Sequence, residues 1–163
     1  MKSVLVLCLM KIISLLPLCI ARFLGRVTGV AMSALKTSSF KIAWRNLTLS
    51  YPEKARHSIV QLAKSRMFHL GQAFFETPIL WRKSSNWLQT KIIAVEGESY
   101  LQKALASDKG TILLIPHQGN WEVIGLWVAQ QASMTSLYQP PKMPALDSWI
   151  KSAREKTGAP AAD

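Results

Sequence analysis

The chain has 163 residues and a formal net charge of +11, with 20 Lys and Arg against 9 Asp and Glu. Its two cysteines both lie in the apolar amino terminus, which excludes a disulfide-rich scaffold and a cysteine-based metal site. The excess charge lies wholly in residues 1–90, which hold 13 basic and 2 acidic residues and suit an anionic membrane surface. No nucleic-acid-binding motif accompanies these cations, so we expect no nucleic acid partner.

The amino terminus, residues 1–35, is predicted to form a membrane anchor and a juxtamembrane helix. Residues 4–21 are apolar apart from Lys11, Ser14 and Pro17, a length at the short end of the range for a transmembrane helix. Lys11 would cost about 2.5–3.5 kcal/mol at the bilayer centre, so a helix lying in the membrane interface is an alternative. A cleaved signal peptide is another, although the small residues of a cleavage site are absent. The basic residues after the anchor predict that the rest of the chain is cytoplasmic.

Residues 36–90 are predicted to form an amphipathic helical region. Ser50 and Glu53 have the spacing of a capping box and Pro52 suits a first helical turn, so we expect a helix to begin there. Apolar residues then recur every three or four positions, as on the buried face of a helix: Ile59, Ala63, Met67, Leu70 and Phe74. Aromatic and basic residues cluster near the end of the region, as at a membrane interface: Trp81, Arg82, Lys83 and Trp87.

Residues 91–163 are predicted to form the first part of an α/β domain. Short apolar runs typical of strands alternate with helical patterns along this region. In chain order these are a strand at 91–97, a helix at 100–107, a strand at 110–115, a helix at 122–129, a strand at 135–138 and a helix ending near 157. This alternation predicts a partial parallel or mixed sheet with flanking helices.

The loop between the second predicted strand and the following helix carries the most informative residues. It reads Pro-His-Gln-Gly-Asn-Trp-Glu, with His117 and Glu122 five positions apart. Loops at the carboxyl ends of strands commonly bind ligands in open α/β sheets. An imidazole there is suited to accept a proton, and a carboxylate at a helix start is favoured in its ionised form and can orient the imidazole. The sequence has no His-Glu-x-x-His motif and no cluster of Cys and His, so we expect no metal.

The motif and several blocks around it resemble one bacterial family. The blocks follow the order found in that family: 45–47, 51–53, 75–76, 137–142, 146–147 and 153–155. Together with the complete motif around His117, these blocks resemble the lipid A biosynthesis late acyltransferases, which are part of the lysophospholipid-acyltransferase-like superfamily. The resemblance covers nearly the whole chain. It rests on the complete motif and on the blocks around it, because a His and an acid separated by four residues would occur often by chance.

The resemblance implies transfer of a fatty acyl group from an acyl thioester to a hydroxyl of a lipid A precursor. His117 would act as the general base, oriented by Glu122, and Arg154, Asn120 and Tyr138 would bind substrate. The donor would be a thioester of acyl carrier protein or coenzyme A, with no further cofactor. The family also implies a location at the bacterial inner membrane, with the catalytic part facing the cytoplasm.

The family pattern continues through further strands and helices beyond Asp163. We therefore expect an amino-terminal portion of an acyltransferase, either a truncated gene product or an incomplete sequence, with an unfinished sheet. One alternative is a non-catalytic, membrane-associated remnant of such an enzyme. Another is a glycerolipid acyltransferase, which uses a similar His and acid. The sequence Asn-Trp-Glu at the end of the motif favours lipid A or a related glycolipid as the acceptor.

Overall fold

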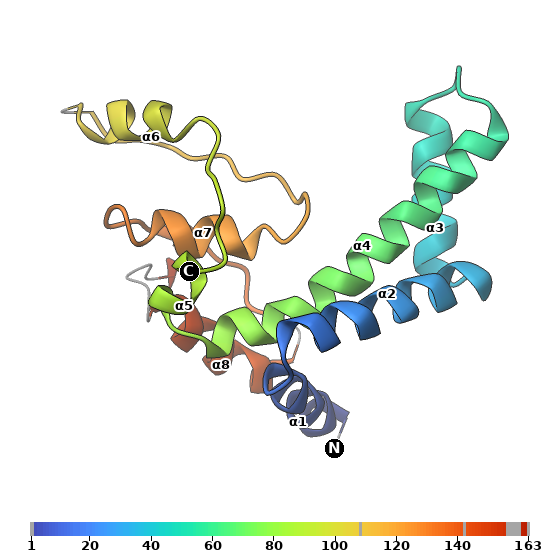
Figure 1. The fold of residues 1–163 in the computed structure, drawn as a ribbon, viewed down its shortest axis with the longest axis horizontal. Helices are drawn as coiled ribbons and strands as arrows, with labels where there is room; N and C mark the ends of the chain where they lie inside the picture. Colours follow the sequence, from blue (N-terminus) through green and yellow to red (C-terminus); the bar gives the residue numbers. More distant parts are fainter. Residues whose placement is uncertain (1, 108, 142, 156–160, 163) are drawn as a thin grey trace. The chain divides into compact units, whose positions relative to one another are not determined.

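The computed structural model describes residues 2–107, 109–141, 143–155 and 161–162, most of which are helical. They divide into two compact units: residues 10–79 form one, and residues 2–9 with the described residues from 80 onwards form the other. In chain order the elements are α1 (Lys2–Ser14), α2 (Leu18–Ala34), α3 (Ser38–Ser50), α4 (Arg56–Arg82), α5 (Ser85–Gln89), α6 (Glu98–Leu105), α7 (Glu122–Val128), β1 (Ser136–Leu137), α8 (Pro144–Glu155) and β2 (Ala161–Ala162) (Figure 1).

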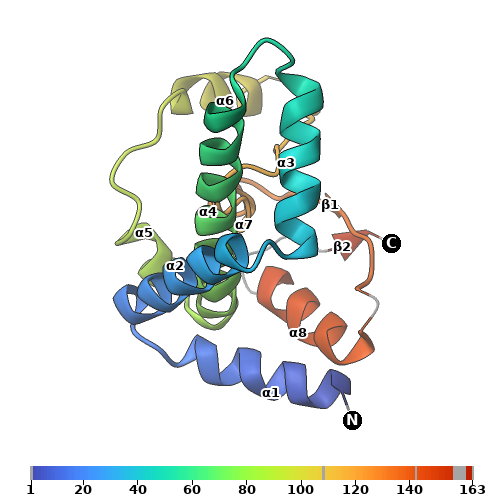
Figure 2. The ribbon, with the colours of Figure 1, turned by 90° about the vertical axis from the view of Figure 1, so that its right-hand side faces the viewer.

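In the unit of residues 10–79, α3 and α4 pack side by side around a small apolar core (Figure 2). Thr37 caps the start of α3, where its side chain accepts a hydrogen bond from the main-chain N–H of Phe40. Phe40 and Ala43 of α3 are buried in one cluster with Ala63 and Met67 of α4. Removal of these side chains from water stabilises the helix pair.

The buried face of α4 follows the predicted apolar stripe only in its first half. The first three members of the stripe are buried as predicted, whereas Leu70 and Phe74 are about half exposed. Gly71 is buried in their place because its backbone lies against α2. The helix also begins later than the capping-box pattern predicted, at Arg56 rather than near Pro52.

Glycines allow α2 and α4 to cross with their backbones in contact. A Cβ atom on Gly25 of α2 would lie 2.6 Å from the carbonyl oxygen of Gly71 in α4, and one on Gly71 would clash with the carbonyl oxygen of Gly25. Gly29, one turn further along α2, meets the backbone of α4 in the same way. An ion pair of 2.6 Å between Arg22 and Glu76 joins the same two helices. The spacing of Gly25 and Gly29 therefore serves close helix packing within this unit.

The predicted continuous membrane helix over residues 4–21 is wrong. The structure ends α1 at Ser14 and starts α2 at Leu18, with Pro17 between them at φ −57° and ψ 142°. A proline disfavours helical geometry in the residue before it, which accounts for the break. Among the described helices, none is by itself both long and apolar enough to cross a membrane. The pair α2 and α3 reaches that length and composition together, but the two helices bend by 74° at the break between them.

In the other unit, a second apolar core joins α5 and α7. It consists of Leu80, Leu88 and Leu126, and the Ser84 side chain caps the start of α5 by accepting from the main-chain N–H of Trp87. The helices α6 and α7 lie within two residues of the predicted boundaries, so these two predictions are confirmed. This core fixes the position of α7, which begins with the acid of the sequence motif.

The predicted partial sheet, and with it the α/β fold class, is wrong for the described residues. The only strands there are β1 and β2, of two residues each, which pair in parallel. The predicted strands at 91–97 and 110–115 form neither helix nor strand (Figure 1). Ile112 and Leu114 in the second segment are 89% and 87% exposed. Apolar and β-branched residues form a strand only where a neighbouring strand completes the hydrogen bonds, and no described segment does so here.

We expect Gly71→Ala to destabilise the unit of residues 10–79 by about 1–3 kcal/mol, because the added methyl group would force two backbones apart. Chemical denaturation followed by circular dichroism measures the change. Gly125→Ala in α7 is the matched control, since a Cβ there would meet nothing within 4 Å and alanine favours a helix. Unchanged stability of the Gly71 variant would contradict the close crossing.

Candidate active site

His117 lies in the loop that leads into α7. The N–H of Gln118 donates to the carbonyl of Pro116 at 2.8 Å, and Gly119 has a φ of +56°, so the loop turns sharply here. A positive φ is readily adopted by glycine, which explains the residue at this position. The His117 side chain is exposed, and its ring centroid lies 5.2 Å from that of Trp121. The imidazole is therefore accessible to a ligand arriving from solvent.

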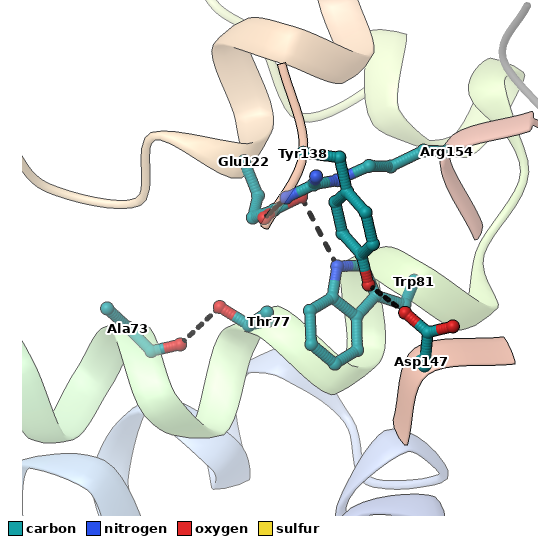
Figure 3. A network of polar contacts seen from close by, with 7 residues as sticks. All are labelled: Ala73, Thr77, Trp81, Glu122, Tyr138, Asp147 and Arg154. Carbon is teal, nitrogen blue, oxygen red and sulfur yellow. Dashed lines mark hydrogen bonds and ion pairs between the residues drawn. The ribbon is translucent and has the colours of Figure 1, made fainter. Parts of the chain in front are cut away.

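Glu122, the first residue of α7, is 5% exposed and lies at the centre of a polar network (Figure 3). Arg154 Nη2, from α8, donates to Glu122 Oε1 at 2.6 Å. Trp81 Nε1, from the end of α4, donates to Glu122 Oε2 at 3.3 Å. Each carboxylate oxygen therefore has a donor. A carboxylate buried without such partners would be very costly, so Arg154 is the group that allows Glu122 to be buried.

The guanidinium of Arg154 also lies against two aromatic rings. Its Cζ atom is 5.5 Å from the ring centroid of Trp121 and 5.3 Å from that of Tyr138. A cation at such distances is attracted to the electron-rich face of a ring. The planar guanidinium can stack on rings and still bind a carboxylate, which a lysine ammonium does less well. These contacts hold the Arg154 side chain in one position.

The same helix, α8, also holds Tyr138. The Tyr138 hydroxyl donates to Asp147 Oδ1 at 2.6 Å, as Figure 3 shows. Asp147 in turn pairs with Lys151, one turn along α8, at 3.7 Å, and the Lys151 ammonium lies 5.3 Å from the Tyr138 ring centroid. Both ends of the network therefore depend on α8, through Arg154 at Glu122 and through Asp147 at Tyr138.

Three of the five predicted site residues meet in this network: Glu122, Arg154 and Tyr138 (Figure 3). His117 is next to it in the chain, but within the part of the chain that the structure describes no hydrogen bond joins His117 to Glu122. The carboxylate is instead bound by Arg154 and Trp81. The predicted roles of these residues toward substrate stay predictions, and Arg154 has an intramolecular anion as its observed partner.

The fifth predicted residue, Asn120, accepts a hydrogen bond at its main-chain carbonyl from the N–H of Val123, at the entry to α7. Sequence reasoning missed Trp81, which the pattern assigned to a membrane interface. The structure buries Trp81 against Trp149 of α8, with ring centroids 5.4 Å apart. Trp81 lies 41 positions from Glu122, so no spacing rule connects the two. The apolar run just before Trp81 was the available signal for burial.

An open groove of about 710 Å³ adjoins the motif. Its lining is mainly apolar and includes Ile92, Val95, Leu101, Leu113, Ile124 and Trp127. Leu113 comes shortly before the motif loop and Ile124 shortly after Glu122, so the groove and the polar network share α7. Its size is in the range of small-molecule binding sites. Among the described residues, no group of His, Cys, Asp and Glu is arranged to hold a metal ion.

Comparison with known proteins identifies the family to which the chain belongs. Residues 1–161 match the family model described as bacterial lipid A biosynthesis acyltransferase. The chain is 40% identical over 37 residues to the phosphatidylinositol mannoside acyltransferases of two Mycobacterium tuberculosis strains, CDC 1551 / Oshkosh and ATCC 25618 / H37Rv. Each match covers 23% of this chain and 12% of the mycobacterial protein. The chain belongs to the bacterial lipid A biosynthesis acyltransferase family, and the resemblance found in its sequence is confirmed.

Arg154→Met should destabilise the protein by about 3–5 kcal/mol, because it leaves the Glu122 carboxylate buried without its cation. Adding Glu122→Gln to this variant should recover part of the loss, since the unpaired charge is then removed. Lys151→Met is the control on the same helix. Its ion pair with Asp147 is longer and more exposed, so about 1 kcal/mol or less should be lost. Urea unfolding of the unmodified protein, of the single variants Arg154→Met and Glu122→Gln, and of the double variant gives the coupling energy. Additive effects would exclude a strong Glu122–Arg154 pair.

Proposed function

We propose that this protein transfers a fatty acyl group from a thioester to a hydroxyl of a glycolipid, with a lipid A precursor as the acceptor. The observation that carries the proposal is the family match over residues 1–161, which includes an exposed His117 followed by the buried Glu122–Arg154 pair. A general base must come within hydrogen-bond reach of the proton that it takes, and the exposed imidazole of His117 is open to such an approach.

In the proposed reaction, His117 takes the proton of the acceptor hydroxyl as its oxygen attacks the thioester carbonyl carbon. A C–O bond forms, the C–S bond breaks, and the thiolate leaves and takes up a proton. The acyl group is transferred directly, without a covalent acyl-enzyme, and the sequence contains no Gly-x-Ser-x-Gly elbow that would supply a serine nucleophile. The thioester belongs to an acyl carrier protein or to coenzyme A.

The apolar groove beside α7 is the proposed site for the acyl chain. Transfer of apolar surface from water into such a groove is favourable by about 0.8 kcal/mol per CH₂ group. Leu113 and Ile124, which line the groove, flank the motif in the chain, so an acyl chain bound there would keep its thioester near His117. Asn120 and Tyr138 remain the candidates for contacts to the polar part of the substrates.

The family and the similar proteins support two acceptors, both glycolipids. The family description specifies lipid A biosynthesis, whereas the mycobacterial relatives are described as acting on phosphatidylinositol mannoside. We favour the lipid A precursor because the family match covers 1–161, while the match to those relatives covers 37 residues. A glycerolipid acceptor is the remaining alternative, and it lacks the sugar hydroxyls that both named acceptors offer.

We also propose that the protein binds the cytoplasmic face of an anionic membrane through α2. Five large apolar side chains along this helix are exposed: Ile20, Phe23, Leu24, Val27 and Val30. The two cations of α2 are directed elsewhere, because Arg22 pairs with Glu76 and Arg26 lies 5.4 Å from the Phe68 ring centroid. The exposed band is therefore apolar, and a helix with such a band can lie in the interface of a bilayer.

The charge of the surrounding unit supports an anionic lipid surface. Residues 10–79 carry 10 Lys and Arg but only Glu53 and Glu76 as acids. Exposed cations of this unit include Lys36, Lys41 and Arg45, at and after the bend between α2 and α3. Each cation close to anionic headgroups adds roughly 1 kcal/mol of binding free energy. Apolar insertion of α2 and these cations would then act together.

His117→Ala should lower acyl transfer from an acyl thioester to a lipid A precursor by about 10²- to 10⁴-fold, the usual contribution of a general base. Transfer of a radiolabelled acyl group, resolved by thin-layer chromatography, measures the loss. His57→Ala is the control, since His57 is exposed and its recorded hydrogen bond is to the neighbouring Ser58. Parallel reactions with phosphatidylinositol mannoside and with a lysoglycerophospholipid identify the preferred acceptor.

Near-normal turnover by the His117 variant would remove the base assignment. Absence of transfer by the unmodified protein with every acceptor, alongside normal membrane binding, would favour the alternative of a non-catalytic remnant.

Phe23→Asp should lower the partition coefficient onto phosphatidylglycerol vesicles by about 10-fold or more, because burying one such side chain is worth about 1.5–3 kcal/mol. Vesicle co-sedimentation measures the partition. Leu137→Asp is the control, because this apolar side chain is also exposed but lies in β1, outside the α2 band. Equal partition of the two variants would argue against insertion of α2, and complete release of the unmodified protein by high salt would leave charge alone as the cause of binding.

A further inference from the structure

We propose that Trp121 is a positioning residue that connects the His117 ring to the buried Glu122–Arg154 pair. The inference rests on the proposed role of His117 as the base, and it assigns a task to a residue outside the five predicted site residues. Trp121 is the residue through which the polar network of α7 and α8 reaches His117 in the described structure.

The loop that carries His117 provides little support for its side chain. Main-chain hydrogen bonds hold the turn from Pro116 to Gln118 and the entry to α7, where the N–H of Val123 donates to the carbonyl of Asn120. The preceding segment, from 110 to 114, is exposed and pairs with no strand. The recorded ring contact of His117 is with Trp121, at a centroid distance of 5.2 Å and an interplanar angle of 53°. The position of the imidazole therefore depends on the position of the indole.

The position of the Trp121 side chain is itself restricted by the start of α7 and by Arg154. It immediately precedes α7, whose first residue, Glu122, is buried. The guanidinium of Arg154 lies 5.5 Å from the Trp121 ring centroid and is fixed by its 2.6 Å bond to Glu122. An indole in contact with a fixed cation and adjacent to a buried helix start has restricted rotamers. The buried ion pair thus acts on His117 through Trp121.

The arrangement gives Glu122 an indirect role in orienting the base. Glu122 fixes Arg154, Arg154 fixes the indole, and the indole limits the rotation of His117. A base that is held in its productive orientation raises the rate of the bound complex, and it leaves the affinity for substrate nearly unchanged. Loss of Trp121 should therefore lower kcat rather than raise KM.

The test compares Trp121→Leu, which removes the ring, with Trp121→Phe, which keeps an aromatic face. In the transfer assay with an acyl thioester and a lipid A precursor, the Leu variant should lose about 10- to 100-fold in kcat with KM within about two-fold of the parent. The Phe variant should recover most of that loss. Trp87→Leu, in α5, controls for the loss of an indole elsewhere in the same unit.

A spectroscopic signal tests the contact without turnover. The ring current of Trp121 should shift the His117 ring-proton resonances in the free protein. This shift should disappear in the Leu variant and persist in part in the Phe variant. His117→Ala identifies the resonance. Arg154→Lys should change the His117 resonance when it is introduced into the unmodified protein. It should leave the resonance unchanged when it is added to Trp121→Leu, because Arg154 affects His117 through the indole.

The outcomes separate this inference from the proposed function. A His117→Ala variant that keeps transfer would end the base assignment, while the resonance shift would still decide whether Trp121 holds the ring. An inactive His117→Ala variant beside a Trp121→Leu variant with unchanged kcat would overturn the positioning role alone. Equal losses of kcat in Trp121→Leu and Trp121→Phe would also overturn the positioning role. A His117 resonance that stays the same in both variants would do so as well.

Discussion

Burial of the Glu122 carboxylate sets the conditions for every other contact of the site. A charge withdrawn from water must be matched by a partner and by hydrogen-bond donors, and here Arg154 and Trp81 supply them. The requirement joins three distant segments, because the partners come from the start of α7, the end of α4 and α8. It also fixes the neighbours of Arg154, since a guanidinium held on Glu122 lies against the rings of Trp121 and Tyr138. The accessible His117 then lies at the border of a rigid network rather than in an isolated loop.

The helical part of the fold was largely predictable from local sequence, whereas the sheet was not. The helix that starts at Glu122 and the short helix before the motif needed only their own apolar spacing and turn residues, and the structure has both. A strand depends on a partner that local sequence does not identify, so the apolar run containing Ile112 and Leu114 was assigned wrongly. The prediction of one continuous helix at the amino terminus was wrong for a different reason. Pro17 breaks the helix, although the residues on both sides of it are apolar.

Sequence identified the members of the site better than their connections. Glu122, Arg154 and Tyr138 were predicted, and they meet in one network. Their pairing followed from burial, which spacing does not encode: the acid expected at His117 is bound to Arg154, and the cation expected for substrate is bound to an acid of the chain itself. Trp81 was not predicted because it is distant from Glu122 in sequence and because an aromatic residue next to cations also suits a surface, where an apolar side chain can present a polar tip. The family match over residues 1–161 includes described residues of both units.

The central claim, that Glu122 organises the site as a buried acceptor, is tested most directly at the indole of Trp81. Nuclear magnetic resonance can follow the Nε1–H signal of this residue and its exchange with solvent in the unmodified protein and in Glu122→Gln. The account predicts a slowly exchanging proton in the unmodified protein, and a marked change of its shift and exchange rate in the variant. The signal of the buried Nε1–H of Trp44, in the other unit, should stay the same in both proteins. Rapid exchange at Trp81 in the unmodified protein, or a signal indifferent to Glu122→Gln, would contradict the account.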